Sequence, residues 1–114
     1  MGKARILIVE DEAIIAQDIR GTLTRLGYEV VGVTDEGQKA LRLAAELRPD
    51  LVLMDVRLRG PVDGLEAGRL IEQSVGSVVT YLTASPDANR MTHSVQKPFS
   101  QASLARAIES SLGH

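Results

Sequence analysis

Four short apolar segments constrain the fold of this chain more than any other feature of its sequence. They lie at residues 4–9, 29–33, 51–54 and 78–82, and valine, isoleucine and leucine dominate them without polar alternation. Such runs are typical of strands that are buried on both faces of a parallel sheet. Because parallel strands are joined only by crossovers, this order predicts βα units with helices on both faces of the sheet.

Helical patterns separate these segments, since apolar residues recur every three or four positions after each of them. The apolar positions are Ile15, Ile19, Leu23 and Leu26, then Leu41, Ala44, Ala45 and Leu47, then Leu65, Leu70 and Ile71, and finally Leu104, Ala105, Ile108 and Leu112. Helix starts are predicted at Asp35 with Gln38 and at Asp63 with Glu66, and helix ends at Gly27 and Pro49. A weaker fifth strand is expected at residues 94–96.

Length and composition exclude several classes of protein. A chain of 114 residues has room for one domain, and with 44% apolar and 25% charged residues it is not a disordered chain. A net charge of −2 gives no global reason for binding nucleic acid or anionic membrane, and cysteine is absent. No apolar run approaches the roughly 18 residues that span a bilayer. We therefore expect a cytoplasmic domain, residues 1–114, without direct nucleic-acid or membrane contacts.

Polar side chains follow the predicted strands at the edge where ligands bind in open α/β sheets. The first strand is followed by Glu10, Asp11 and Glu12, the third by Asp55, the fourth by Thr83 and the fifth by Lys97. Carboxylates brought this close repel one another, and a bound divalent cation removes the conflict. Hard oxygen ligands without a soft ligand favour Mg²⁺.

This set of residues predicts phosphoryl chemistry. An aspartate that is bridged to a metal and also receives phosphate would act as a nucleophile and form an aspartyl phosphate. Asp55 holds that position, Thr83 would hydrogen-bond one phosphoryl oxygen, and Lys97 would neutralise another.

The sequence resembles the receiver domain of response regulators in bacterial two-component signalling. The matching blocks are residues 6–12, 51–55, 63–64, 82–84 and 97–99, and they cover the chain in the family's order. The resemblance implies a flavodoxin-like five-stranded sheet of order 2-1-3-4-5. It also implies Mg²⁺ held by Glu10, Asp11, Asp55 and the backbone carbonyl of Arg57, and phosphoryl transfer to Asp55 from a sensor histidine kinase or phosphotransfer protein.

The sequence departs from the family pattern at three places. The acidic pair is Glu10 and Asp11 where two aspartates are commoner, and the loop from residue 55 to 64 is one residue longer than usual. Only 13 residues separate Thr83 from Lys97, and Ser94 stands where the family has an aromatic switch residue. We therefore predict that the fourth helix of the family is reduced or replaced by a loop, with residues 84–93 forming a mobile loop or one irregular turn. An alternative gives the aromatic role to Tyr81.

We expect a stand-alone phosphoacceptor without an output domain, which signals by phosphorylation-dependent binding of a downstream protein. It would catalyse its own phosphorylation and dephosphorylation rather than act as a turnover enzyme. A module that binds partners without phosphorylation is the second hypothesis, although such modules usually lose one of the site residues. A Mg²⁺-dependent phosphatase requires an aspartate where Arg57 stands, and a flavin carrier requires a phosphate loop where Glu10–Glu12 would repel phosphate.

Overall fold

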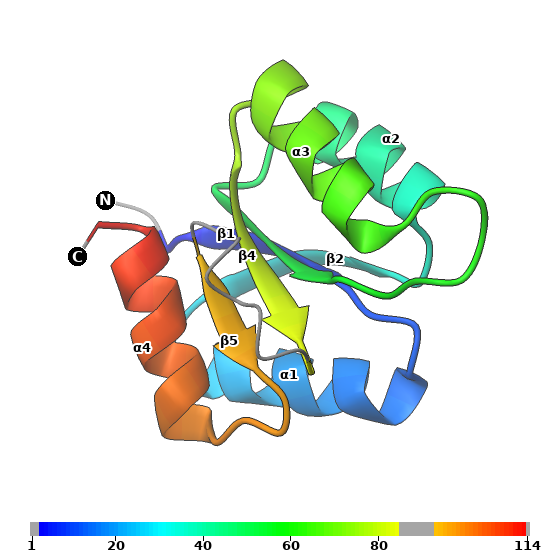
Figure 1. The fold of residues 1–114 in the computed structure, drawn as a ribbon. Coiled ribbons are helices and arrows are strands. Elements are labelled where there is room, and N and C mark those ends of the chain that lie inside the picture. Colours follow the sequence, from blue (N-terminus) through cyan, green and yellow to red (C-terminus); the bar gives the residue numbers. More distant parts are fainter. Residues whose placement is uncertain (1–2, 85–92, 114) are drawn as a thin grey trace.

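The computed structural model describes residues 3–84 and 93–113, which form a parallel five-stranded sheet of order β2-β1-β3-β4-β5 (Figure 1). The strands are β1 (Arg5–Val9), β2 (Glu29–Thr34), β3 (Leu51–Asp55), β4 (Val78–Thr83) and β5 (Ser94–Gln96). The helices are α1 (Ala13–Arg25), α2 (Gly37–Leu47), α3 (Gly64–Ser74) and α4 (Gln101–Ser111). The predicted fold class and strand order are confirmed, including the weak fifth strand.

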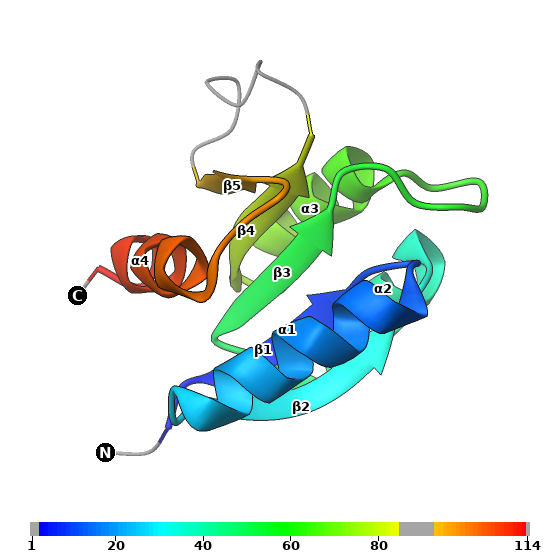
Figure 2. The same ribbon diagram turned by 90° about the horizontal axis from the view of Figure 1, so that it is seen from below.

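Helices cover both faces of the sheet. Helices α1 and α4 lie on one face, with α1 over β1 and β2 and α4 beside β4 and β5, while α2 and α3 lie on the other (Figures 1 and 2). Successive residues of the central strands therefore enter different cores. In β1, Ile6 and Ile8 pack toward α1 and α4, whereas Leu7 and Val9 pack toward α2 and α3. Because both faces are covered, the strands contain no polar alternation.

The burial of the helix residues corrects part of the predicted core. Leu26 and Leu70 are 44% and 41% exposed rather than buried. The buried positions of α2 and α3 are mainly small residues: Gly37, Ala40, Ala44, Gly64, Ala67 and Gly68, together with Ile71. The apolar periodicity included Ala44 and Ile71 but missed the other buried positions, where small residues allow these helices to approach the sheet closely.

Helix termini confirm one predicted cap and correct another. The Asp63 side chain accepts a hydrogen bond from the backbone N–H of Glu66 at 2.9 Å, as its spacing predicts. The cap predicted at Asp35 is wrong, because α2 begins at Gly37 and its N-cap, Glu36, makes no side-chain cap hydrogen bond. Asp35 instead forms an exposed ion pair, in which its Oδ1 lies 3.7 Å from Nζ of Lys39.

Two further features concern the start of α4 and the length of the helices. A capping box at Ser100 and Ser103, which the sequence analysis missed, starts α4. Among the described residues, no helix is both long and apolar enough to cross a lipid bilayer.

The segment between β4 and β5 is where the sequence predicts that a helix is reduced or replaced by a loop. Strand β5 pairs with β4 through Ser94 opposite Tyr81 and Gln96 opposite Thr83. The predicted loop or single turn at residues 84–93 falls on residues 85–92, which lie outside the described residues. Tyr81 is buried in the core between the sheet and α3, where its ring faces Gly68.

Candidate functional site

The site lies at the carboxyl ends of the strands, where the topology brings four of them to one edge of the sheet. Glu10 directly follows β1, Asp55 ends β3, Thr83 ends β4 and Lys97 follows β5. Backbone hydrogen bonds to neighbouring strands fix two of these positions: the N–H of Glu10 donates to Thr34 O at 3.0 Å, and that of Lys97 to Thr83 O at 2.7 Å. The sheet therefore presents residues distant in sequence at one place.

Lys97 joins two of the carboxylates. Its Nζ lies 2.8 Å from Oε1 of Glu10 and 3.2 Å from Oδ2 of Asp55. The three side chains are 18%, 0% and 9% exposed respectively, so this ion-pair network is largely shielded from solvent. Hydrogen bonds between ionised groups in such surroundings are short and strong.

The surroundings of this network change its acid–base properties. Burial raises the pKa of Glu10 from 4.5 to about 7, the hydrogen bond from Lys97 opposes this rise, and Asp55 adds to it. Burial alone would lower the pKa of Lys97, but the hydrogen bond to Glu10 and the charge of Asp55 raise it. Lys97 therefore stays cationic, and its single positive charge is shared by two carboxylates.

Asp55 is held by contacts on both of its carboxylate oxygens. Oδ1 accepts the backbone N–H of Arg57 at 3.1 Å, while Oδ2 accepts Lys97. The start of α3 passes directly over the Asp55 backbone, and a Cβ at Gly64 would collide with the Asp55 carbonyl oxygen. The glycine after Asp63 thus allows the β3–α3 loop to close over the end of β3.

The residues present fit a hard divalent cation. One carboxylate oxygen from each of Glu10, Asp11 and Asp55 lies within 4.8 Å of the others. Three hard oxygen donors with open sides are the kind of partial cage that Mg²⁺ uses while retaining several waters. Glu12 does not join this group, because it is exposed and contributes its backbone N–H to Oε2 of Glu10 at 3.2 Å.

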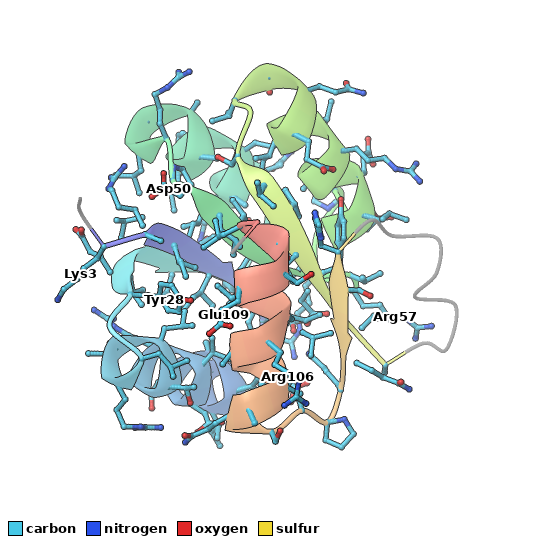
Figure 3. The ribbon with its side chains drawn as sticks, turned by 90° about the vertical axis from the view of Figure 1, so that its left-hand side faces the viewer. Lys3, Tyr28, Asp50, Arg57, Arg106 and Glu109 are labelled. Carbon is cyan, nitrogen blue, oxygen red and sulfur yellow. The ribbon has the colours of Figure 1, made fainter. Side chains whose placement is uncertain are left out.

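The remaining predicted residues lie beside this group. Thr83 is buried at the end of β4, and it follows Leu82, which pairs with Asp55 in the sheet. Arg57 follows β3 closely, and its side chain lies on the outer surface of the molecule (Figure 3). His93 is half-buried directly before β5, and it is not a member of the acidic group.

One residue of the site was not predicted from the sequence. Nε of Arg59, in the β3–α3 loop, lies 3.7 Å from Oδ2 of Asp11. The sequence does not connect these two residues, because 48 positions separate them and an arginine in a loop carries no distinctive signal. Only the path of the loop reveals the contact.

Comparison with known proteins agrees with this geometry. A model of the response regulator receiver domain matches residues 6–109. The chain belongs to the response regulator receiver family. Receiver domains are signalling domains rather than turnover enzymes, and histidine kinases phosphorylate them.

The receiver domain has relatives of known sequence and structure in bacteria. Transcriptional regulatory protein PdtaR of Mycobacterium tuberculosis is 40% identical over 114 residues, which cover 92% of this chain and 55% of PdtaR. The chain spans about half the length of the curated relatives it matches.

Two solved structures resemble this receiver domain along nearly its whole length. The receiver domain of a modulated diguanylate cyclase from Desulfovibrio desulfuricans G20 has a TM-score of 0.89 at 34% identity, covering 97% of this chain and 94% of that one. The receiver domain of a sensor histidine kinase from Pseudomonas aeruginosa PAO1 has a TM-score of 0.86 at 31% identity, covering 99% and 100%. That structure has a magnesium ion coordinated in its active site cleft.

Proposed function

We propose that this receiver accepts a phosphoryl group on Asp55 from a sensor histidine kinase or phosphotransfer protein. In this proposal Mg²⁺ is held by Glu10, Asp11, Asp55 and the backbone carbonyl of Arg57. The observation that carries the proposal is the Lys97 ammonium between Glu10 and Asp55, at 2.8 and 3.2 Å. A buried cation in contact with the end of β3 is positioned to stabilise negative charge arriving there.

The transfer step uses the carboxylate of Asp55 as nucleophile. One Asp55 oxygen attacks phosphorus, the bond between phosphorus and the donor histidine nitrogen breaks, and the leaving imidazole keeps the electron pair and takes up a proton. Bound Mg²⁺ supplies further neutralisation of the phosphoryl oxygens. The Lys97 ammonium neutralises negative charge on one phosphoryl oxygen, and the Thr83 hydroxyl donates a hydrogen bond to another.

Hydrolysis of the aspartyl phosphate returns the receiver to its resting state. Water attacks phosphorus, the acyl phosphate bond to Asp55 breaks, and inorganic phosphate leaves the regenerated carboxylate. Lys97 stabilises the phosphoryl group during hydrolysis as well. No second protein is needed for this hydrolysis, so the lifetime of the signal is a property of the receiver itself.

Signalling would follow from phosphorylation-dependent binding of a downstream protein. Thr83 and Lys97 belong to β4 and to the end of β5, so movement of these groups toward the phosphoryl oxygens alters the surface that these strands share. That the 114 residues act as a stand-alone protein stays a prediction. The proposal applies to the receiver domain whether it acts by itself or within a longer chain.

Intact mass spectrometry after incubation with acetyl phosphate and Mg²⁺ tests this function. We expect one added phosphoryl group on the wild type and none on Asp55→Asn. Asp18→Asn, which changes an exposed aspartate of α1, is the matched control and keeps the adduct. An adduct that persists in Asp55→Asn contradicts the assignment of the phosphoacceptor.

A further inference from the structure

Two different cations form ion pairs with the three carboxylates of the site. Within the described part of the chain, Lys97 forms its ion pairs with Glu10 and Asp55. Asp11 is instead paired with Arg59, whose Nε lies 3.7 Å from Oδ2. Each of the three carboxylates available to a metal therefore already faces a positive charge, and for Asp11 that charge comes from the β3–α3 loop.

The backbone brings Arg59 to this place. Arg59 forms a parallel β-bridge with Glu36, so the β3–α3 loop is attached to the residue that precedes α2. Farther along the loop, the backbone of Val62 lies close to Gly37, because a Cβ at Gly37 would lie 2.6 Å from the carbonyl oxygen of Val62. The loop is thus fixed against the start of α2, and the Arg59 side chain extends from it toward Asp11.

The two members of this ion pair differ in exposure. The Asp11 side chain is 17% exposed, whereas the Arg59 side chain is 86% exposed. Its guanidinium can therefore move into solvent without leaving a buried group unsatisfied, and exposed pairs of this kind are weak. Lys97, by contrast, is held between two buried carboxylates and has no such freedom.

We propose that Arg59 is a displaceable counter-ion, which neutralises Asp11 in the metal-free receiver and must leave it when Mg²⁺ binds. The inference rests on the proposed function, because it takes Asp11 as a metal ligand. Arg59 then lowers the affinity for Mg²⁺ in two ways: it occupies the Asp11 carboxylate, and it repels the incoming cation. Arg59 is a positioning residue in this scheme, and it does not contact the reacting atoms.

The Mg²⁺ dissociation constant, measured by isothermal calorimetry and by amide chemical shifts, tests this inference without reference to activity. We expect Arg59→Gln to bind Mg²⁺ up to about fivefold more tightly than the wild type, which is the range that an exposed ion pair supplies. Arg59→Lys keeps the charge and stays near the wild type. Because salt screens such pairs, the difference between wild type and Arg59→Gln shrinks at high KCl concentration.

Arg20→Gln is the matched control. Arg20 is an exposed arginine of α1 that lines the same cavity of about 580 Å³ as Asp11, and it forms no ion pair with another described residue. Removing it changes the net charge of the domain equally but frees no metal ligand. An equal gain in Mg²⁺ affinity in Arg20→Gln would show that the effect of Arg59→Gln comes only from the change in net charge. That result would overturn the inference.

Two other outcomes separate this inference from the proposed function. Unchanged or weaker Mg²⁺ binding in Arg59→Gln, with normal phosphorylation of wild-type Asp55, overturns the counter-ion and leaves the function intact. Absence of Mg²⁺ binding and of phosphorylation in the wild type overturns both. Amide spectra of the metal-free variants check whether the loop keeps its contact with Glu36.

Discussion

Lys97 Nζ lies 2.8 Å from Glu10 Oε1, so an ion pair joins residues 87 positions apart at the carboxyl ends of the outer and inner strands. The Glu10 side chain is fully buried in this contact, and burial is the main reason that its pKa is raised. The pair therefore links the acid–base behaviour of the site to the stability of the fold.

The raised pKa of Glu10 predicts how stability depends on pH in the metal-free receiver. Between the ordinary value of 4.5 and the folded value of about 7, the folded state binds more protons than the unfolded state. Linkage then requires that the Glu10 contribution to stability is present below pH 4.5 and is lost as pH rises through about 7. Urea unfolding of wild type and Glu10→Gln at a series of pH values measures this, and Glu10→Gln lacks that component of the decline. Parallel profiles for the two proteins would count against it.

Removing the cation has a larger effect than removing an exposed charge. Lys97→Met leaves Glu10 and Asp55 close together without their shared partner. We expect a loss of about 2 kcal/mol of unfolding free energy at neutral pH, because a buried charged group loses its hydrogen-bond partner. The loss is smaller at pH 5, where protonation of Glu10 relieves the repulsion. Lys39→Met, which breaks an exposed pair with Asp35, should cost less than about 1 kcal/mol.

The packing of α3 on β4 predicts a second stability effect. A Cβ at Gly68 would collide with the Tyr81 ring and hydroxyl, so Gly68→Ala should destabilise the domain by about 1–3 kcal/mol. Gly21→Ala in α1 is the matched control, because only the end of the flexible Arg25 side chain lies near, at 3.3 Å. That variant should gain about 0.5–1 kcal/mol from helix propensity. Thermal unfolding compares the two, and equal effects would refute the packing argument.

A buried hydrogen bond connects β4 to the last helix. Thr80 Oγ1 lies 2.7 Å from Ser111 Oγ, which in turn donates to the carbonyl oxygen of Ala107 at 2.7 Å. Thr80→Val and Ser111→Ala should each cost about 1 kcal/mol, and the double variant should cost less than their sum. Denaturant unfolding of the four proteins measures the coupling. Strict additivity would show that the hydroxyls do not stabilise each other.

Much of the fold and of the candidate site could be predicted, because buried strands are recognisable in the sequence and the site residues lie at their ends. Buried runs such as 51–54 reveal the strands, and the topology then places Asp55 and Lys97 at one edge. The faces of α2 and α3 could not be predicted as well, because Gly68 and Ala40 are buried by close packing that their small size permits rather than by hydrophobicity. The prediction for residues 84–93 concerns a segment that the structure does not describe beyond Ala84 and His93.

The sequence by itself determined the order of strands and helices, the presence of an acidic group, and the identity of the residues at the strand ends. These are local properties, since periodicity and the residue after each strand are read directly along the chain. Only the tertiary structure decided that Lys97 faces Glu10 as well as Asp55, and that Arg59 reaches Asp11. The physical reason is that a loop's path depends on contacts such as Glu36 with Arg59, which join distant segments and leave no periodic trace in the sequence.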